Sequence, residues 1–114
     1  MIGIDIEKVE RFKSFKKTFL NKMFTKQEIE YAYSFSEPFT HLAGMWCVKE
    51  AFIKAVKNKN VPLKQIEIMH KENGAPYINI TPNLEEYLIE ENYSYIDISI
   101  THTDETACGV VEII

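Results

Sequence analysis

Three charged residues stand in apolar stretches of this sequence, and their types and spacing suit phosphate chemistry. Asp5 lies within the run IGIDI, and Glu50 and Lys54 lie within GMWCVKEAFIKAV. If the second stretch is a helix, Glu50 and Lys54 share one face because they are four residues apart. A carboxylate in such surroundings must be paired, solvated or bound to a cation. Two carboxylates, water and the phosphates of a ligand make a typical magnesium site, and nearby lysine can hold a further phosphate oxygen.

The same residues also have a plainer interpretation. Asp5 can face solvent from a strand with one wet side, or it can cap the next helix. Glu50 and Lys54 can form an exposed ion pair, which stabilises a helix by only ~0.3–0.5 kcal/mol. The spacing alone leaves both interpretations open.

Only one of the three histidines has neighbours that suggest a role. His102 lies in SITHT, at the end of a predicted strand, with hydroxyl residues on both sides. Such a histidine is a surface turn residue, a phosphate contact or a general base. His41 and His70 stand alone in the sequence, and we assign them no role.

The elements that must position these residues follow from apolar spacing and turn signals. Thr25 followed by Glu28 has the form of a capping box, Asn73-Gly74 favours a hairpin, and Thr81-Pro82 begins a helix. The pattern predicts, in order, a strand in IGIDI, helices at 8–20, 25–35 and 39–58, a hairpin at 66–80, a helix from Thr81, and strands in YIDISIT and ACGVVEII. Early helices and late antiparallel strand pairs predict an α+β fold, a small and mostly antiparallel sheet packed against helices.

Length and composition are those of an ordinary globular protein. The chain has 114 residues, 46% of them hydrophobic and 26% charged, which predicts a single domain over residues 1–114. It contains no apolar run long enough to span a membrane, and its start lacks the features of a signal peptide, so we expect a cytoplasmic location. Cys47 and Cys108 are far apart and lack metal-binding spacing, which favours free buried thiols.

The charge is unevenly distributed. Residues 8–26 hold seven Lys or Arg residues and one Glu, a local charge of +6, whereas the whole chain has a net charge of −4. A basic segment on an acidic protein predicts either a docking surface for an anionic partner or a solvated helix face. Nucleic acid is the weaker candidate, because the rest of the surface repels phosphate.

Five stretches of the sequence together resemble one family. MIGIDIEKVERF, FTKQEIEY, LAGMWCVKEAFIKA, IEIMHKENGAPYI and ISITHTDETACGVV occur in the order and spacing of the holo-acyl-carrier-protein synthases, the short bacterial 4'-phosphopantetheinyl transferases. The resemblance covers essentially the whole chain. It implies transfer of 4'-phosphopantetheine from coenzyme A to a serine of apo acyl carrier protein, in fatty acid and lipid biosynthesis, with release of adenosine 3',5'-bisphosphate. It also implies a need for magnesium and a homotrimer with active sites between subunits.

The resemblance assigns roles to particular residues. It makes Asp5 and Glu50 the magnesium ligands and Lys54 a contact to coenzyme A phosphate, so that these three are the expected catalytic residues. The nucleotide pocket is expected to involve four further residues, Gly74, Pro76, His102 and Thr103. The basic helix then docks the acidic carrier protein through Arg11, Lys13, Lys16 and Lys17, while Phe12 and Phe15 are either an apolar anchor or core residues.

The sequence also departs from the family pattern. Many members have arginine where Met45 stands, and that arginine is expected to help hold the 3'-phosphate of coenzyme A. The departure keeps an alternative open, a non-catalytic module of the same fold that binds coenzyme A or the carrier protein. For an active enzyme, the base that accepts the serine proton is expected to be a metal-bound water or a carboxylate near the metal, with His102 as the second choice.

Overall fold

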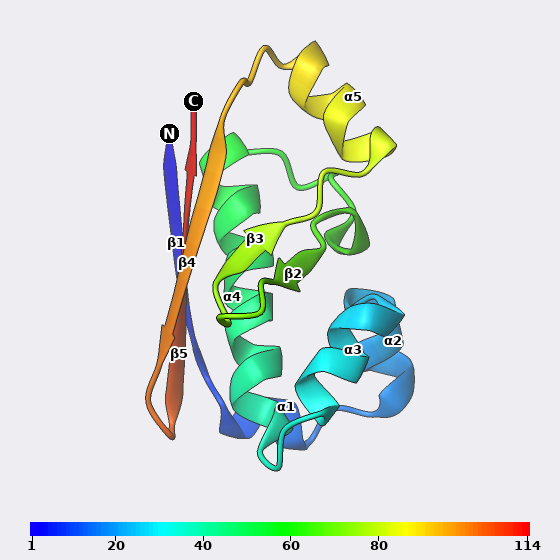
Figure 1. Cartoon of the computed structure of the whole chain (residues 1–114), viewed down its shortest axis with the longest axis vertical. Coiled ribbons are helices and arrows are strands. Elements are labelled where there is room, and N and C mark those ends of the chain that lie inside the picture. The colour runs from blue at the N-terminus through cyan, green and yellow to red at the C-terminus, as the bar shows by residue number, and fades with distance from the viewer.

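The computed structural model describes all 114 residues as a sheet covered by helices on one face (Figure 1). The sheet is fully antiparallel, in the order β1-β5-β4, and consists of β1 (Ile2–Lys8), β4 (Ile96–His102) and β5 (Thr106–Ile113). The helices are α1 (Glu10–Lys13), α2 (Lys17–Met23), α3 (Lys26–Tyr33), α4 (Pro38–Val56) and α5 (Pro82–Glu90), with a short 3-10 turn at Leu63–Gln65. A separate hairpin pairs β2 (Ile68–His70) with β3 (Pro76–Ile78). This arrangement confirms the expected α+β class.

Helix α4 is the centre of the core, and it packs unusually close to the sheet. A Cβ atom on Gly3 would lie only 1.8 Å from the carbonyl oxygen of Ala51, and one on Gly109 would lie 2.7 Å from the amide nitrogen of Val48. Glycine is therefore required at both strand positions, because any side chain there would push α4 away. The close approach fixes α4 against β1 and β5, the strands that flank its functional residues.

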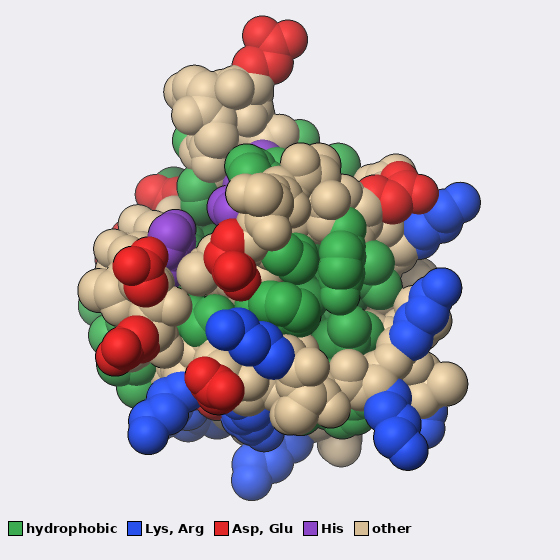
Figure 2. Space-filling view, turned by 90° about the horizontal axis from the view of Figure 1, so that it is seen from below, with side chains coloured by type: hydrophobic (Ala, Val, Ile, Leu, Met, Phe, Trp, Pro, Cys, Tyr) green, Lys and Arg blue, Asp and Glu red, His purple; other side chains and the backbone are tan.

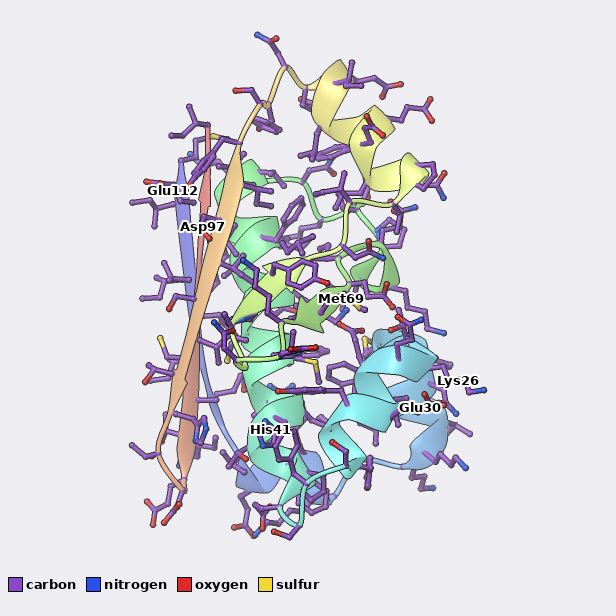
Figure 3. All side chains as sticks on the ribbon, viewed as in Figure 1. Lys26, Glu30, His41, Met69, Asp97 and Glu112 are labelled. Atoms are coloured by element: carbon purple, nitrogen blue, oxygen red, sulfur yellow. The ribbon has the colours of Figure 1, made fainter.

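The sheet has one covered face and one bare face. Gly3, Asp5 and Glu7 point toward α4, whereas Ile2, Ile4 and Ile6 point away from it, each with more than half of its surface exposed. Figure 3 shows Asp97 and Glu112 on the same bare face, where the two residues are register partners. The acids of β1 thus face the helix, and its isoleucines face solvent.

The prediction of one continuous helix at 8–20 is wrong. The segment forms two short helices, α1 and α2, separated by residues 14–16. The Ser14 hydroxyl donates to the carbonyl oxygen of Arg11 at 3.0 Å, and Lys16 has an extended backbone. The break lets Phe12 enter the core while Phe15 packs at its margin, stacked edge-on against Phe12. Of the two alternatives left open for these phenylalanines, the core position is the one that Phe12 takes.

Most of the remaining local predictions are confirmed. Thr25 and Glu28 form a complete capping box at the start of α3, and the Thr81 hydroxyl accepts from the amide of Leu84 at the start of α5. The hairpin turn has Gly74 at φ 87°, which explains the glycine there. Both cysteines are free, although Cys108 is only half-buried.

A buried ion pair joins α3 to α4. The Lys49 ammonium lies 2.9 Å from Glu28, and neither side chain is exposed. Lys49 also donates to the carbonyl oxygens of Leu63 and Ile66, and Glu28 accepts from the amide of Ile68. Lys49 is therefore a structural residue that links α3, α4 and the segment leading into β2. No helix in the structure is long and apolar enough to cross a membrane.

Candidate active site

The predicted catalytic residues meet between β1 and α4. The Lys54 ammonium lies 3.0 Å from Asp5 Oδ1 and also donates to the carbonyl oxygen of Ile4 at 3.1 Å. The Asp5 side chain is only 11% exposed, whereas that of Lys54 is 56% exposed. Asp5 is therefore not a surface residue on a wet strand, and its partner lysine remains open to a ligand.

Glu50 adds negative charge to the same place. Partial burial raises the pKa of Glu50, and the charges of Asp5 and Glu7 raise it further, while Lys54 and Arg11 oppose the shift. The Glu50 carboxyl is therefore within electrostatic range of Asp5 and Glu7 on β1. Such an arrangement favours occupation by a cation.

The donor set fits a magnesium ion that keeps water ligands. Asp5 Oδ2 is buried and accepts no hydrogen bond of ordinary geometry, and the Cys47 thiol beside Asp5 is only a weak donor. This oxygen can therefore bind a ligand from outside the chain. No cluster of three or more His, Cys, Asp or Glu side chains has the geometry of a complete metal site. Magnesium does not require one, because it is usually bound through one or two carboxylates together with water and substrate phosphates.

Cys47 lies beneath this site as a neutral group. Its pKa is raised to about 12 by burial and by the nearby charges of Asp5 and Glu7. The thiol donates to the carbonyl oxygen of Ala107 at 3.5 Å. A thiol with so high a pKa is not a nucleophile at neutral pH, so Cys47 is a packing residue of the site floor.

Arg11 belongs to the edge of this site as well as to the basic surface. Its guanidinium binds Glu7 at 2.7 Å and lies over the rings of Phe15 and Trp46, at 5.5 and 5.8 Å from their centroids. Beside it, the indole N–H of Trp46 is buried without a partner. The sequence predicted a docking role for Arg11, and the structure places it next to the carboxylates.

The other three docking residues are freely exposed. Lys13 ends α1, Lys16 lies in the break and Lys17 begins α2, and none of them is in an ion pair. Figure 2, viewed from the end of the molecule where α1, α2 and α3 lie, shows an apolar patch with basic side chains below it and to its right and acidic side chains to its left. Lys17 also lines a hollow of about 420 Å³ with the apolar side chains of Phe15, Leu20 and Ile29 among its walls.

A second hollow holds most of the residues predicted to bind the nucleotide. It has a volume of about 170 Å³, and Gly74, Pro76 and His102 all line it. His41 and His70 line it too, from α4 and β2. Neither histidine could be identified from the sequence, because each stands alone in the chain and they meet only through folding. Figure 3 shows His41 near the start of α4, on the side of α3.

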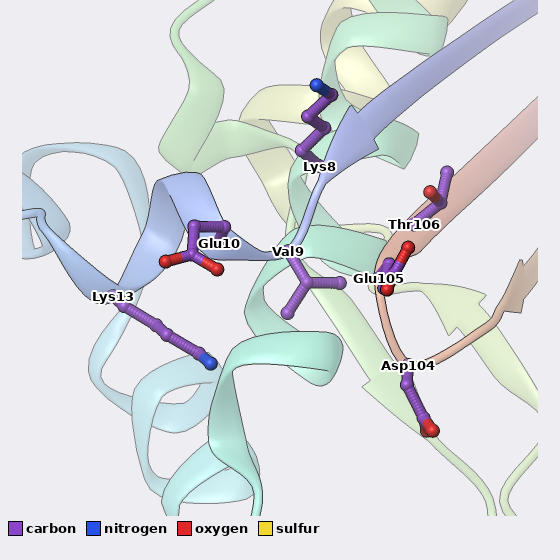
Figure 4. A pocket seen from close by; sticks show the side chains of 7 residues that line it. All are labelled: Lys8, Val9, Glu10, Lys13, Asp104, Glu105 and Thr106. Atoms are coloured by element: carbon purple, nitrogen blue, oxygen red, sulfur yellow. The ribbon is translucent and has the colours of Figure 1, made fainter.

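Thr103, the fourth predicted nucleotide residue, lies outside that hollow. Its hydroxyl accepts from the amides of Glu105 and Thr106 and so shapes the turn between β4 and β5. Beside this turn lies a further hollow of about 390 Å³. Figure 4 shows its lining residues, which come from the end of β1, from α1 and from the β4–β5 turn. Lys13 is the only predicted site residue that lines it. Asp5, Glu50 and Lys54 line neither this hollow nor the one that holds the three histidines.

Comparison with known proteins gives consistent matches over the whole chain. The model of the 4'-phosphopantetheinyl transferase superfamily matches residues 1–111. A holo-[acyl-carrier-protein] synthase from Thermodesulfovibrio yellowstonii is 40% identical over 109 residues, which cover 88% of this chain and 96% of the relative.

Two solved structures have the same fold. The holo-[acyl-carrier-protein] synthase of Neisseria meningitidis matches with a TM-score of 0.86 and 28% identity, over 98% of this chain and 94% of that chain. The synthase of Helicobacter pylori, solved in complex with coenzyme A, matches with a TM-score of 0.85 and 28% identity over 100% of both chains.

Proposed function

This chain belongs to the 4'-phosphopantetheinyl transferase superfamily, and from that membership we infer that it is an enzyme that transfers phosphopantetheine from coenzyme A to acyl carrier protein. The observation that carries the inference is the meeting of Asp5, Glu50 and Lys54 between β1 and α4 in a chain that matches holo-acyl-carrier-protein synthases over its length. The reaction prepares acyl carrier protein for fatty acid synthesis. We propose that residues 1–114 form one transferase domain.

The reaction breaks a phosphoanhydride and forms a phosphodiester. The serine hydroxyl of the carrier protein attacks the phosphorus that bears pantetheine. The new bond joins the serine oxygen to that phosphorus, and the electron pair of the broken bond stays on the phosphate of adenosine 3',5'-bisphosphate. The nucleophile comes from the partner, which explains why the enzyme needs no activated serine or cysteine of its own.

We propose that Asp5 and Glu50 hold the magnesium ion. The free Asp5 Oδ2 and the mutual repulsion of the two carboxylates support this role. A magnesium ion held there would neutralise negative charge on the diphosphate of coenzyme A. Lys54, more than half exposed and already beside Asp5, is placed to donate to the leaving phosphate as its charge grows.

The proton of the attacking serine needs an acceptor near the same carboxylates. We propose that a carboxylate of the Asp5–Glu50 site, directly or through water, is that base. His102 remains the second candidate. It lines the histidine-containing hollow, which does not include the carboxylates.

We propose that the acidic carrier protein docks on Lys13, Lys16 and Lys17, with Arg11 at the border between the docking surface and the carboxylates. Opposite charge on the two surfaces speeds association and has less effect as salt rises. The apolar hollow beside Lys17 supplies a site for an apolar side chain of the carrier.

We propose that the functional unit is a homotrimer with active sites between subunits. The bare face of the sheet supports this, because Ile2, Ile4 and Ile6 form an exposed apolar row, with Cys108 and Val110 as register partners of Ile6 and Ile4. Apolar patches of this kind commonly mark protein interfaces. Gly74, Pro76, His102 and Thr103 are proposed to bind the nucleotide part of coenzyme A, across the subunit boundary from the carboxylates. The cytoplasmic location stays a prediction.

The test is incubation of the protein with apo acyl carrier protein, coenzyme A and magnesium, followed by mass spectrometry of the carrier. An adduct of the mass of phosphopantetheine supports the transferase. Coenzyme A binding without an adduct on the cognate carrier contradicts it and favours the alternative, a non-catalytic binding module of the same fold.

A further inference from the structure

The chain contains a single arginine, and it lies between the basic surface and the proposed metal-binding carboxylates. Arg11 is the only arginine among 13 Lys and Arg residues, so every other basic position holds lysine. The two side chains carry the same charge but differ in shape, because a guanidinium is planar, stacks on aromatic rings and offers five N–H donors in a fixed fork. The role of Arg11 should therefore depend on the orientation of its side chain as well as on its charge.

The guanidinium of Arg11 is held from two directions. Glu7 Oε2 accepts a hydrogen bond from Nη1 at 2.7 Å, and neither side chain makes another hydrogen bond within the chain. The rings of Phe15 and Trp46 lie beside the same group, with Cζ 5.5 and 5.8 Å from their centroids. The Arg11 side chain is nevertheless 48% exposed. Its Nε and Nη2 donors are therefore available to a partner from outside the chain.

Helix α1 does not provide this order by itself. It has only four residues and no side-chain cap, and so short a helix is not stable in isolation. The buried Phe12 attaches its backbone to the core, but the long side chain of Arg11 can rotate unless its end is held. Glu7 provides the support, since it lies opposite Ala107 in the paired strand β1 and only 18% of its side chain is exposed. The ion pair thus ties the arginine to the sheet.

We propose that Glu7 is a positioning residue for the carrier protein, because it fixes the Arg11 guanidinium where its remaining donors can meet a carboxylate of the carrier. The proposal rests on the proposed function, in which an acidic carrier docks on Lys13, Lys16 and Lys17. Glu7 takes only Nη1, so the edge of the guanidinium formed by Nε and Nη2 stays whole. Such an edge binds a carboxylate through two parallel hydrogen bonds. An arginine that is already ordered also loses less side-chain entropy on binding.

Charge alone predicts the opposite result for the loss of Glu7. Removal of an acid near a basic surface makes that surface more positive, which tightens binding of an acidic carrier. Loss of positioning weakens the binding instead. Glu10 offers a matched comparison, because it is an exposed acid at the start of α1 that forms no ion pair. The sign of the change therefore separates the two effects.

The experiment measures dissociation constants for an apo carrier protein whose acceptor serine is replaced by alanine, by calorimetry at low salt. Glu7→Met is expected to weaken binding about two- to tenfold, the usual cost of ordering one long side chain on association. Glu10→Met should leave the binding unchanged or slightly tighter. Coenzyme A with magnesium should bind both variants as tightly as it binds the unmodified protein. Unchanged or tighter carrier binding by Glu7→Met overturns the proposal, and so does weaker coenzyme A binding, which would place Glu7 in the metal-binding centre.

A second variant tests whether Glu7 acts through the shape of the arginine. Arg11→Lys keeps the charge but removes the fork and the planar stacking group. We expect it to weaken carrier binding at least as much as Glu7→Met does. Adding Glu7→Met to Arg11→Lys should then cause no further weakening, because no guanidinium is left to position. A further loss equal to that of Glu7→Met alone would contradict the proposal.

Order at Arg11 is measured without any carrier. The single arginine gives a single Nε–H signal in NMR spectra, and nitrogen relaxation at that signal should show an ordered group in the unmodified protein and a mobile one in Glu7→Met. Equal order in the two proteins overturns the proposal. Loss of this order and weaker carrier binding in Glu7→Met, from a protein that modifies no carrier, would refute the proposed function alone. If the carrier is modified yet binds Glu7→Met as tightly as the unmodified protein, only the positioning role is refuted.

Discussion

Lys54 and Asp5 form an ion pair at 3.0 Å across the contact between α4 and β1, in which one carboxylate oxygen is paired and the other is buried without a partner. A pair built only for stability would satisfy both oxygens or expose them to water. The unpaired aspartate oxygen and the exposed lysine are the groups of this pair that can bind a ligand from outside the chain.

Replacement of the lysine separates the two roles of this pair. Lys54→Met is expected to lower carrier modification by about 100-fold, the usual effect of removing one group that stabilises transition-state charge. The free energy of unfolding should change by less than about 1 kcal/mol, because the Lys54 side chain is mostly exposed. Single-turnover mass spectrometry and urea denaturation measure the two effects. Lys59→Met, which removes an exposed lysine just beyond the same helix, is the control and should leave both unchanged.

Lys49, the lysine that precedes Lys54 on α4, is expected to have the opposite effect, mainly on stability. Lys49→Met leaves the buried carboxylate of Glu28 without its partner and is expected to destabilise the fold by about 3–5 kcal/mol in urea denaturation. Adding Glu28→Gln should recover part of that loss, since the buried charge is then removed. Equal stability of Lys49→Met and the unmodified protein would show that this pair does not anchor α3 to α4.

Acid should weaken the fold through the histidine hollow. The pKa of His41 and His70 is lowered in the folded state, so near and below their unfolded pKa of about 6.5 the unfolded chain binds more protons. Their contribution to stability is complete above that pH and falls as the pH decreases toward 5.5. Urea denaturation at pH 7.5 and 5.5 measures the difference, which His41→Phe/His70→Phe should reduce. If the variant loses as much stability between pH 7.5 and 5.5 as the unmodified protein does, these rings are not the cause of the loss.

Reversal of charge on the basic surface should affect the carrier and not coenzyme A. Lys16→Glu/Lys17→Glu is expected to lower kcat/KM for the carrier protein by at least about tenfold at low salt and to flatten its salt dependence, because steering by opposite charge is lost. KM for coenzyme A should stay the same. Lys59→Glu makes a single charge reversal outside this surface, and an effect as large as that of the double variant would argue against a defined docking surface.

Much of the fold followed from local signals, because caps and turns depend on a few adjacent residues. Thr25 with Glu28, Thr81 with Pro82 and Asn73-Gly74 each act within four residues of chain, and each element begins or turns where expected. The helix at 8–20 failed because apolar spacing does not reveal a backbone break. Lys16 is extended, and the break at residues 14–16 lets Phe12 enter the core while Phe15 packs at its margin.

The candidate site was predictable only in part. Asp5, Glu50 and Lys54 were found from charge in apolar surroundings, but the alternation of β1 did not say which face is covered, and the isoleucines turned out to face solvent. His41 and His70 are 29 residues apart in numbering and come together only because α3, α4 and the hairpin pack around Tyr31. Contacts of that range leave no pattern in a single sequence.

Carrier modification by the unmodified protein, Asp5→Asn and Glu50→Gln, each with magnesium and with a chelator, tests the central claim most directly. Both substitutions keep side-chain shape and remove the charge proposed to hold the metal. We expect the phosphopantetheine adduct only with the unmodified protein in the presence of magnesium, with losses of at least about 100-fold in either variant. Full activity in both variants, or undiminished activity in the chelator, would contradict the assignment of Asp5 and Glu50 as the metal-binding centre of this enzyme.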